Sequence, residues 1–314
     1  MGTESSRNFP TNSVSHAKAL AGMSGGDVIA LSIGQVAAEE LASLGAYGAD
    51  KVWDAGEASQ GLDNQVYTAV IASAMEKSGA SVLVMAHNNV GKALAPRVSV
   101  RLKAGLVSGV VSLPDSVGPV TVSKKVFSGK AVGSLKVTTE KAILTVAQNS
   151  FEIAETGGSA AVEAFDAGVA AGSAKTQVKD VQKQEGKLLL TDAEVVISGG
   201  RGLKAAENWG PIEELASLLG GATACSRPVS DEGWRPHEEH TGQTGKIIAP
   251  NLYMAFGISG AIQHLAGVSS SKCIVAVNTD KDAPIFEAAD YGIVGDALKV
   301  LPKLIEEIKA AKAQ

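Results

Sequence analysis

The sequence predicts an α/β protein of two domains, the first built on a mixed sheet and the second on a doubly wound parallel sheet. Three observations lead to this fold class. The chain has 314 residues, which exceeds one ordinary hydrophobic core. Apolar residues make up 45% and charged residues 19%, a balance typical of buried parallel strands and not of disorder. Short β-branched runs alternate with helical stretches in both halves.

The first domain opens with short β-branched runs separated by helical stretches, which predicts a parallel sheet with crossover helices. The runs lie at 27–32, 51–53 and 81–86, and the helical stretches include 36–44 and 63–78. From 107 to about 147, Val, Thr, Ser and Lys alternate, as in Pro119–Phe127 and Ser134–Thr139. This alternation predicts antiparallel strands, so we expect the first sheet to be mixed.

The domain boundary is expected near residue 188. Residues 157–176 are rich in Gly, Ala and Ser, and a polar strand-like piece follows at 177–190, with a turn at Glu185–Lys187. The predicted domains are therefore 1–188 and 189–314.

The second domain repeats the alternation of strand and helix in regular order. Strands are expected at 193–198, 222–226, 252–258, 274–277 and 291–294, with helices at 205–219 and 297–311. Strand-to-loop switches at this spacing predict a small doubly wound sheet.

Composition and charge exclude several classes of function. The net charge is −5 and aromatic residues make up 4%, so neither a basic patch nor stacking platforms for nucleic acid are indicated. Cys225 and Cys273 are the only cysteines, 48 positions apart, so no disulfide framework or zinc site is indicated. Met1–Asn12 has no apolar targeting segment, and no run is long enough to span a membrane. We expect a soluble, intracellular protein.

Polar residues follow the strands of the second domain at their carboxyl ends, where an open parallel sheet binds its ligands. A single Ser or Asn after a strand is more often a cap or a turn residue. Because polar residues occur at every strand-to-loop transition of this domain, we expect them to share one ligand crevice. Two arginines beside a Gly-rich turn suit a diphosphate. The residues are Arg201, Ser226, Arg227, Gln243, Thr244, Ser259–His264, Asn278 and Asp296.

The stretch from Thr241 to Asn278 is the most informative of the chain. An apolar strand breaks at Gly257 into a turn that carries a hydroxyl, an amide and an imidazole, at Ser259, Gln263 and His264. Turn N–H groups suit an anion, and the additional polar side chains offer more hydrogen bonds than a phosphate alone requires.

Common enzyme motifs are absent from this region. The turn at Gly199–Gly202 is not the Gly-x-Gly-x-x-Gly fingerprint of nicotinamide cofactors. The sequence around Ser259 is short of a nucleophile elbow, and Cys225 has no adjacent His. His16, His87, His237 and His240 show no metal-ligand spacing, so we expect no metal site.

Leu252–Gly267 followed by Ile274–Asn278 resembles the signature of the electron transfer flavoprotein alpha subunit (FixB) family at every defined position. The resemblance covers the whole second domain, and the first domain loosely. The other matching segments are Gly199–Leu203, Ala224–Arg227, Gly242–Lys246, Asp282–Phe286 and Ala289–Ile293, with Gly91–Arg97 and Leu102 in the first domain.

The resemblance implies a nucleotide-hydrolase-like first domain that serves as dimer scaffold, and a second domain that binds FAD. It implies that Arg227 lies against the isoalloxazine, that Thr244 bonds near N5 and that His264 faces the pyrimidine carbonyl. An imidazole there would stabilise negative charge on the reduced ring. The implied FAD contacts are Arg201, Ser226, Arg227, Thr241, Gly242, Gln243, Thr244, Ser259, Gly260, Ala261, Ile262, Gln263, His264, Asn278, Asp296 and Ala297.

The same resemblance implies an electron carrier without substrate turnover of its own. Its partner would be a beta subunit that completes the flavin pocket and holds an AMP, with one FAD per heterodimer. Electrons would come from acyl-CoA and related dehydrogenases of fatty-acid β-oxidation and pass to a quinone oxidoreductase. The expected compartment is a bacterial cytoplasm, or the mitochondrial matrix for a processed form. Members usually open with an apolar strand that Met1–Arg7 lacks, so we expect the first strand to be truncated.

Two other functions stay open at this point. One is a nicotinamide-dependent oxidoreductase on a related α/β head, and the other is a nucleotide-binding regulatory protein built on the first domain. The absorption spectrum of the bound cofactor separates the first from a flavin carrier, and nucleotide binding by residues 1–188 alone would favour the second.

Overall fold

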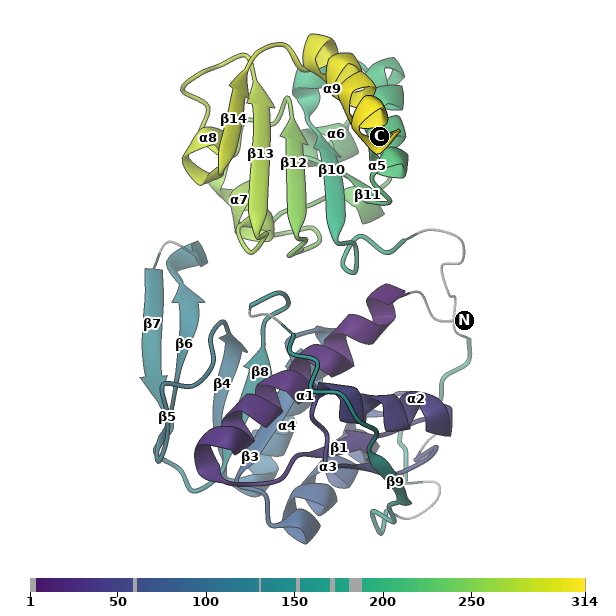
Figure 1. Cartoon of the computed structure of the whole chain (residues 1–314), viewed down its shortest axis with the longest axis vertical. Helices are drawn as coiled ribbons and strands as arrows, with labels where there is room; N and C mark the ends of the chain where they lie inside the picture. The colour runs from purple at the N-terminus through teal and green to yellow at the C-terminus, as the bar shows by residue number, and fades with distance from the viewer. Residues whose placement is uncertain are drawn as a thin grey trace. The chain divides into compact units, whose positions relative to one another are not determined.

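The computed structural model describes residues 4–58, 61–129, 131–150, 153–169, 173–180 and 188–313, with only the backbone for 4–10 and 128. The chain divides into two compact units, one of Arg7–Lys183 and one that contains 188–313 (Figure 1). The change of unit and the turn expected at Glu185–Lys187 fall in 181–187, outside the described residues, so the boundary at 188 stays a prediction. Residues 177–180 and 188–190 form no strand. No helix in the described ranges is long and apolar enough to cross a membrane.

The first unit holds two sheets, which agrees with the predicted mixed α/β domain. Strands β1, β2 and β9 form a parallel sheet, and a second sheet has the order β3-β8-β4-β6-β5, with β7 on β6. The elements are α1 (Glu4–Ser24), β1 (Ile29–Ser32), α2 (Ala38–Ala42), β2 (Lys51–Asp54), α3 (Asn64–Ser78), β3 (Val82–Ala86), α4 (Asn89–Leu102), β4 (Gly105–Val110), β5 (Ser116–Val117), β6 (Val120–Val126), β7 (Ala131–Lys136), β8 (Ala142–Val146) and β9 (Ala161–Ala164).

Two expectations for the first unit need correction. Strand β8 was expected among the antiparallel strands, but it pairs in parallel with both β3 and β4. All five of its residues are buried, which is typical of a central strand covered on both faces. Strand β3 was expected beside β1 and β2, yet it belongs to the other sheet. The described residues before β1 form helix α1, and the truncation of an opening strand stays a prediction.

The second unit is a five-stranded, fully parallel sheet in the order β11-β10-β12-β13-β14, which confirms the doubly wound prediction. The expected helix at 205–219 is split into a 3-10 helix at Ala206–Trp209 and helix α5. The elements are β10 (Val195–Gly199), α5 (Gly210–Leu218), β11 (Ala222–Cys225), α6 (Arg227–Asp231), β12 (Leu252–Phe256), α7 (Ile262–Val268), β13 (Cys273–Asn278), α8 (Ile285–Ala288), β14 (Tyr291–Val294) and α9 (Ala297–Lys312).

The near-continuous apolar runs of β10, β12 and β13 supply both cores of this unit. On one face, Ile197, Met254 and Phe256 pack with residues of α5 and α9. On the other face, Val196, Tyr253 and Ala276 pack with residues of α7 and α8 (Figure 1). Because both faces are covered near the centre, these strands read as hydrophobic runs without alternation.

The strand order reverses between β10 and β12, which are neighbours in the sheet but not in the sequence. Each is followed by a Gly-containing turn at its carboxyl end. At such a switch point the two chain connections leave toward opposite faces of the sheet, so a crevice opens between them. The fold thus places the best ligand position at the turns after β10 and β12.

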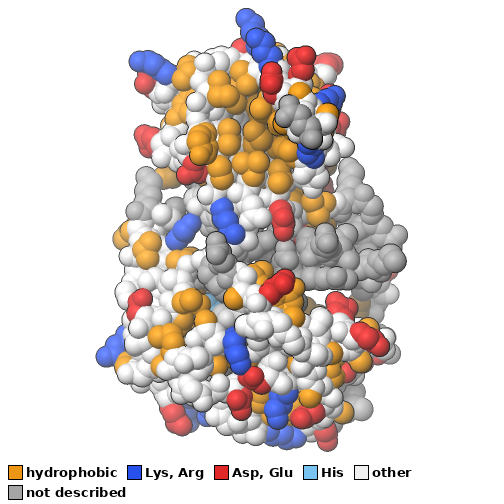
Figure 2. Space-filling model, viewed as in Figure 1, with side chains coloured by type: hydrophobic (Ala, Val, Ile, Leu, Met, Phe, Trp, Pro, Cys, Tyr) orange, Lys and Arg blue, Asp and Glu red, His pale blue; other side chains and the backbone are white. Residues whose placement is uncertain are grey.

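The outer part of the sheet leaves apolar side chains in contact with solvent. Cys273 and Val275 of β13 and Tyr291 and Ile293 of β14 share the α9 face by register. Tyr291 is 69% exposed and Ile293 is 43% exposed. Figure 2 shows hydrophobic side chains gathered over this part of the second unit. Contiguous exposed apolar surface of this kind marks an interaction surface.

Candidate functional site

A cavity of about 650 Å³ opens at the carboxyl ends of β10, β11 and β12, within the second unit. This volume lies in the range of small-molecule and cofactor sites. The cavity collects most of the residues that the sequence placed in a shared crevice. Its lining includes Arg201, Ser226, Arg227, Thr241, Gly242, Gln243, Thr244, Ser259, Gly260, Ala261, Gln263, His264 and Asn278.

The turns after β10 and β12 lie backbone against backbone. The N–H of Gly200 donates to the Phe256 carbonyl at 2.8 Å, and the N–H of Gly202 donates to the Gly257 carbonyl at 3.0 Å. A Cβ atom at Gly200 would lie 2.2 Å from the Gly257 oxygen, which leaves no room for a side chain. Gly257 also has a φ of 65°, in the left-handed region. Glycine is therefore required on both sides of this contact.

The turn after β12 is held open toward the cavity by its neighbours. The Asn278 side-chain N–H group donates to the Ile258 carbonyl at 2.9 Å, and the Ile285 N–H donates to the Ser259 carbonyl at 3.0 Å. Gly260 has a φ of 80°, and a Cβ atom there would meet the Ile285 backbone at 2.3 Å. The amide of Asn278 thus shapes the turn, and the turn presents its backbone to the ligand.

The loop at Thr241–Thr244 closes the other side of the cavity. Thr241 is fully buried, and its N–H and hydroxyl both donate to the Cys225 carbonyl, at 3.0 and 3.2 Å. The Gln243 N–H donates to the Gln263 carbonyl at 2.7 Å. The loop is therefore fixed to β11 on one side and to α7 on the other. This arrangement holds the Thr244 and Gln243 side chains at the cavity wall.

Two arginines and one hydroxyl supply the anion-binding chemistry. Arg201 and Arg227 each have one loose carboxylate partner, Glu232 at 3.7 Å and Asp231 at 3.3 Å, and their side chains are 70% and 65% exposed. Ion pairs this exposed contribute little, so both guanidinium groups can turn to a ligand. Ser226 occupies the N-cap position of α6, but its side chain makes no cap hydrogen bond. These donors suit phosphate oxygens.

His264 is a buried imidazole at the cavity wall. Its Nε2 lies 2.7 Å from the Tyr253 hydroxyl, and its Nδ1 has no hydrogen-bond partner within the described ranges. Burial lowers the pKa of His264 to about 4, although the Thr241 backbone partly offsets this. Burial also raises the pKa of Tyr253, so the phenol keeps its proton and donates to the neutral imidazole. Tyr253 therefore fixes the orientation of the His264 ring.

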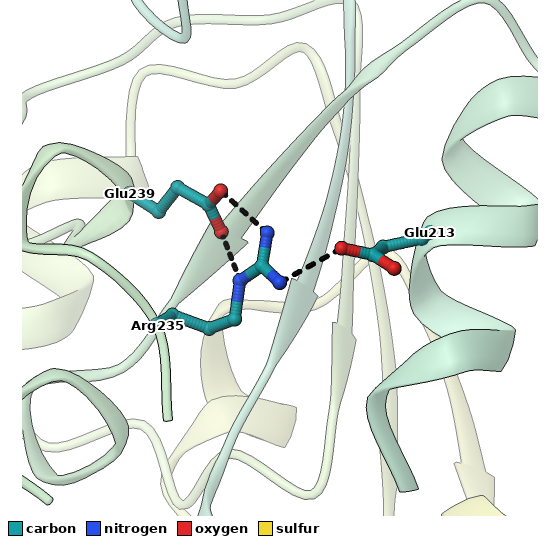
Figure 3. Close-up of polar contacts among 3 residues, drawn as sticks. All are labelled: Glu213, Arg235 and Glu239. Carbon is teal, nitrogen blue, oxygen red and sulfur yellow. Dashed lines mark hydrogen bonds and ion pairs between the residues drawn. The ribbon is translucent and has the colours of Figure 1, made fainter. Parts of the chain in front are cut away.

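An arginine clamp fixes the segment that leads into the loop (Figure 3). Arg235 donates to both oxygens of Glu239, at 2.8 and 2.7 Å, and to Glu213 of α5 at 2.7 Å. Its guanidinium also lies 5.4 Å from the centre of the Trp209 ring. The Arg235 side chain is only 17% exposed, so this bidentate pair is stronger than a surface ion pair. The clamp positions the 3-10 helix at His237–Glu239 and the following His240.

Three of the predicted contact residues do not line the cavity. Ile262 begins α7 and is 51% exposed. Asp296 is the N-cap of α9, where its carboxylate accepts from the Leu298 N–H at 3.0 Å, and Ala297 is buried in the core on the α9 face. Whether these three residues contact the cofactor stays a prediction.

The structure adds lining residues that are not among the predicted cofactor contacts. They are Gly202, Pro228, Asp231, His240, Gly257 and Ile258. Of these, His240 is assigned no role from the sequence, because its spacing to Cys and to carboxylates does not suggest a metal site. His240 directly precedes the Thr241–Thr244 loop in the sequence, and this position indicates that it lies close to the cavity.

Metal and thiolate chemistry find no support in this cavity. No group of three His, Cys, Asp or Glu side chains suited to a metal ion occurs among the described residues. Cys225 is fully buried, and burial raises the pKa of its thiol to about 12. The thiol therefore stays protonated and is a poor nucleophile.

Sequence comparisons decide the family. Residues 4–170 match the family model described as "Electron transfer flavoprotein domain", and residues 189–269 match "Electron transfer flavoprotein FAD-binding domain". The chain is 37% identical over 288 residues to "Electron transfer flavoprotein subunit alpha" of Bacillus subtilis, which covers 90% of this chain and 88% of the relative. The chain belongs to the electron transfer flavoprotein alpha-subunit family.

Two further relatives in the electron transfer flavoprotein family widen this comparison. "Electron transfer flavoprotein subunit alpha, mitochondrial" of Dictyostelium discoideum is 43% identical over 234 residues, 72% of this chain and 65% of the relative. "Protein FixB" of Escherichia coli is 38% identical over 264 residues, 82% of this chain and 83% of the relative. Family membership confirms the resemblance read from the sequence and an electron-transfer role.

The cavity residues fit the FAD that electron transfer flavoproteins bind in this domain. At the cavity wall, Gly202, Gly257 and Gly260 carry no side chain, so the backbone of both turns can approach a diphosphate closely. The unused Ser226 hydroxyl and two exposed guanidinium groups supply donors for anionic oxygens. The buried Nδ1 of His264 is a polar atom without a partner within the described ranges.

The glycine contact at the switch point gives a first prediction. We expect Gly200→Ala to destabilise the second unit by on the order of 1–3 kcal/mol and to lower FAD retention, because the new methyl group would push the Gly257 backbone away. Gly210→Ala is the matched control, since a Cβ atom there meets nothing within 4 Å. Urea unfolding and flavin absorbance per protein measure both effects. Full FAD retention in Gly200→Ala would show that the close approach is dispensable.

The burial of His264 gives a second prediction. Its pKa of about 4 in the folded chain lies below the ordinary 6.5, so the unfolded chain takes up the proton first as the pH falls. Stability from this group is complete above pH 6.5, and up to about 3 kcal/mol is lost on going down to pH 4. We expect His264→Gln to unfold with a weaker acid dependence than the unsubstituted chain, measured by urea unfolding at pH 7 and pH 5.

His237→Gln is the control for this comparison, because His237 is exposed. It removes a surface imidazole and leaves His264 in place, so the acid dependence that comes from His264 should remain. The same acid dependence in His264→Gln as in the unsubstituted chain would mean that another group causes the loss of stability.

Proposed function

We propose that this chain is the FAD-carrying subunit of a heterodimeric electron carrier that has no substrate turnover of its own. One observation supports this most strongly. The cavity at the switch point combines a Gly-lined backbone contact for a diphosphate with two exposed arginines and a neutral, buried histidine. That set suits a flavin dinucleotide whose ring gains negative charge on reduction.

The lining residues divide the cavity into two ends. Arg201 and Gly257–Ala261, from the turns after β10 and β12, suit the diphosphate. Arg227 and the Thr241–Thr244 loop, with His264, suit the isoalloxazine ring. In this orientation we propose that Arg227 lies against the ring, Thr244 bonds near N5 and His264 approaches the pyrimidine carbonyl. When bound, FAD supplies the redox chemistry, and these side chains hold the ring and balance its charge.

We further propose the partners that the resemblance implied. A beta subunit would complete the flavin pocket and hold an AMP, with one FAD per heterodimer. Acyl-CoA and related dehydrogenases of fatty-acid β-oxidation would donate electrons, and a quinone oxidoreductase would accept them. Relatives of the chain come from bacteria and from a mitochondrion, so a bacterial cytoplasm or a mitochondrial matrix fits.

The uncovered face of the outer strands supports a partner subunit. Tyr291 and Ile293 of β14 lie in register with Val275 and Val277 of β13, and they extend the apolar face beyond the area that α9 covers (Figure 2). A second chain that lay on this face would remove that apolar surface from water, which favours association.

The absorption spectrum tests the proposed function. Co-expressed with its beta subunit, the chain should be purified as a yellow complex that bleaches on reduction with dithionite. A colourless complex that binds NADH instead would contradict the flavin carrier and would favour a nicotinamide-dependent oxidoreductase. Dehydrogenase-dependent bleaching, measured with an acyl-CoA dehydrogenase and its substrate, tests the proposed donor separately.

Arg227 and Arg201 give a third prediction, because they carry the same charge at opposite ends of the cavity. Arg227→Ala should lower the first-electron potential of the flavin, since a fixed positive charge near the ring is lost. A charge of this exposure contributes about 1 kcal/mol, or roughly 40 mV for a one-electron couple. Arg201→Ala should weaken FAD binding and leave the potential nearly unchanged.

Potentiometric titration and equilibrium dialysis of FAD measure the two effects. Both variants keep the fold in this account, because each arginine is exposed and only loosely paired. Equal potentials in Arg227→Ala and the unsubstituted complex would place that arginine away from the ring.

A further inference from the structure

His240 is a second buried imidazole at the cavity wall, beside the Thr241–Thr244 loop. Its side chain is 3% exposed, and its Nδ1 is buried without a hydrogen-bond partner among the described residues. The ring packs closely on the loop, since a Cβ atom at Gly242 would lie 3.6 Å from its Nε2 and one at Gly245 would lie 2.8 Å from its Nδ1. A buried nitrogen without a hydrogen bond costs folding free energy, so its presence at the cavity wall calls for a structural or functional explanation.

An exposed imidazole lies next to this buried one. The ring centres of His237 and His240 are 5.4 Å apart, and their planes are tilted by 53°. Nδ1 of His237 lies 3.5 Å from the Ser230 hydroxyl, and both side chains reach the surface. One water molecule, or rotation of the exposed ring, is enough to pass a proton over this separation. The two imidazoles thus lie side by side, one at the cavity wall and one at the protein surface.

The arginine clamp keeps the two imidazoles in this arrangement. Glu239 lies between them in the sequence, and both of its oxygens are held by Arg235, which is also bonded to Glu213 of α5 (Figure 3). The His240 N–H donates to the His237 carbonyl at 3.1 Å, which closes the 3-10 turn. Neither histidine is thus free to leave its place without breaking a partly buried ion pair.

The charges around His240 leave it neutral when the cavity holds no anion. Burial lowers the pKa of His240 most, His237 and Arg227 lower it further, and Asp231 raises it. The other facing groups add no negative charge: the Cys225 thiol stays protonated, Glu239 is neutralised by Arg235, and His264 is itself neutral. A negative charge that develops on a bound group beside His240 would shift this balance toward the imidazolium.

Building on the proposed flavin function, we propose that His237 and His240 form a proton path, in which His240 takes up one proton from bulk water when an electron reaches the flavin. The electron comes from the donor protein, and the proton comes from water through His237. His240 changes from imidazole to imidazolium, and no bond to the flavin forms or breaks. One electron and one proton arrive together, so the net charge of the cavity stays the same.

The direct test is a histidine titration by NMR in the complete FAD-containing complex with its beta subunit. Imidazole signals of ¹³C-labelled histidine are followed against pH with the flavin oxidised and then fully reduced, and His240→Gln assigns the signal. We expect the pKa of His240 to lie below 6.5 in the oxidised complex and to rise on reduction. The same pKa in both states overturns the proposal.

A second measurement uses the pH dependence of the first-electron potential. In the unsubstituted complex the potential should fall as the pH rises, by up to the equivalent of one proton per electron, a tenfold change in equilibrium constant per pH unit. In His240→Gln this slope should flatten. An unchanged slope in His240→Gln, or loss of the slope only in His264→Gln, overturns the proposal by placing the proton elsewhere.

Exogenous imidazole tests the outer step of the path. Because His237 is exposed, His237→Ala should keep the equilibrium slope but take up the proton more slowly, seen with a pH indicator in stopped flow. Added imidazole should restore the rate, and His87→Gln, in the other unit, is the control. Full-speed uptake in His237→Ala overturns the path. Failure of the proposed function is recognised separately, because the complex would then lack the flavin spectrum.

Discussion

The contact between the turns after β10 and β12 is the constraint on which the rest of the site depends. The Gly200 and Gly202 N–H groups bond to the carbonyls of Phe256 and Gly257, and no side chain fits between the two backbones. Because the strand order reverses here, the two turns form the floor of a crevice and keep their remaining backbone groups for a ligand. The β11 turn and the Thr241–Thr244 loop then supply the walls.

The electrostatics of the cavity follow from a difference in burial. Arg201 and Arg227 are exposed and keep their charge, so they attract an anionic ligand from solution. His264 and His240 are buried, and burial lowers the pKa of each imidazole, so both are neutral at pH 7; the proposed proton uptake is assigned to His240 alone. The arginines supply a fixed charge that binds the cofactor, and His240 supplies a charge that can change at the ring end. This arrangement suits a cofactor whose own charge changes.

Much of the second unit could be predicted because its signals are local. Buried parallel strands can be recognised as apolar runs without knowing which strands they pair with. The glycines that follow β10 and β12 likewise indicate turns without further information. The sequence could not show that Asp296 uses its carboxylate to cap α9, or that Ile262 begins α7 with an exposed side chain, since both depend on the helix that follows. His240 was missed because a backbone bridge to Cys225, distant in sequence, brings it to the cavity. Strand β8 was assigned to the antiparallel set because it ends the Val- and Thr-rich stretch at 107–147, whereas its parallel neighbours β3 and β4 make it a buried central strand.

We propose that the switch-point cavity holds FAD beside the fixed positive charge of Arg227 and the neutral, buried imidazoles of His264 and His240. The first-electron potential of the flavin in the purified complex of this chain and its beta subunit tests it most directly. The account predicts a potential well above that of free FAD measured under the same conditions, because negative charge on the reduced ring is stabilised by the Arg227 end of the cavity. A potential equal to or below that of free FAD would contradict it.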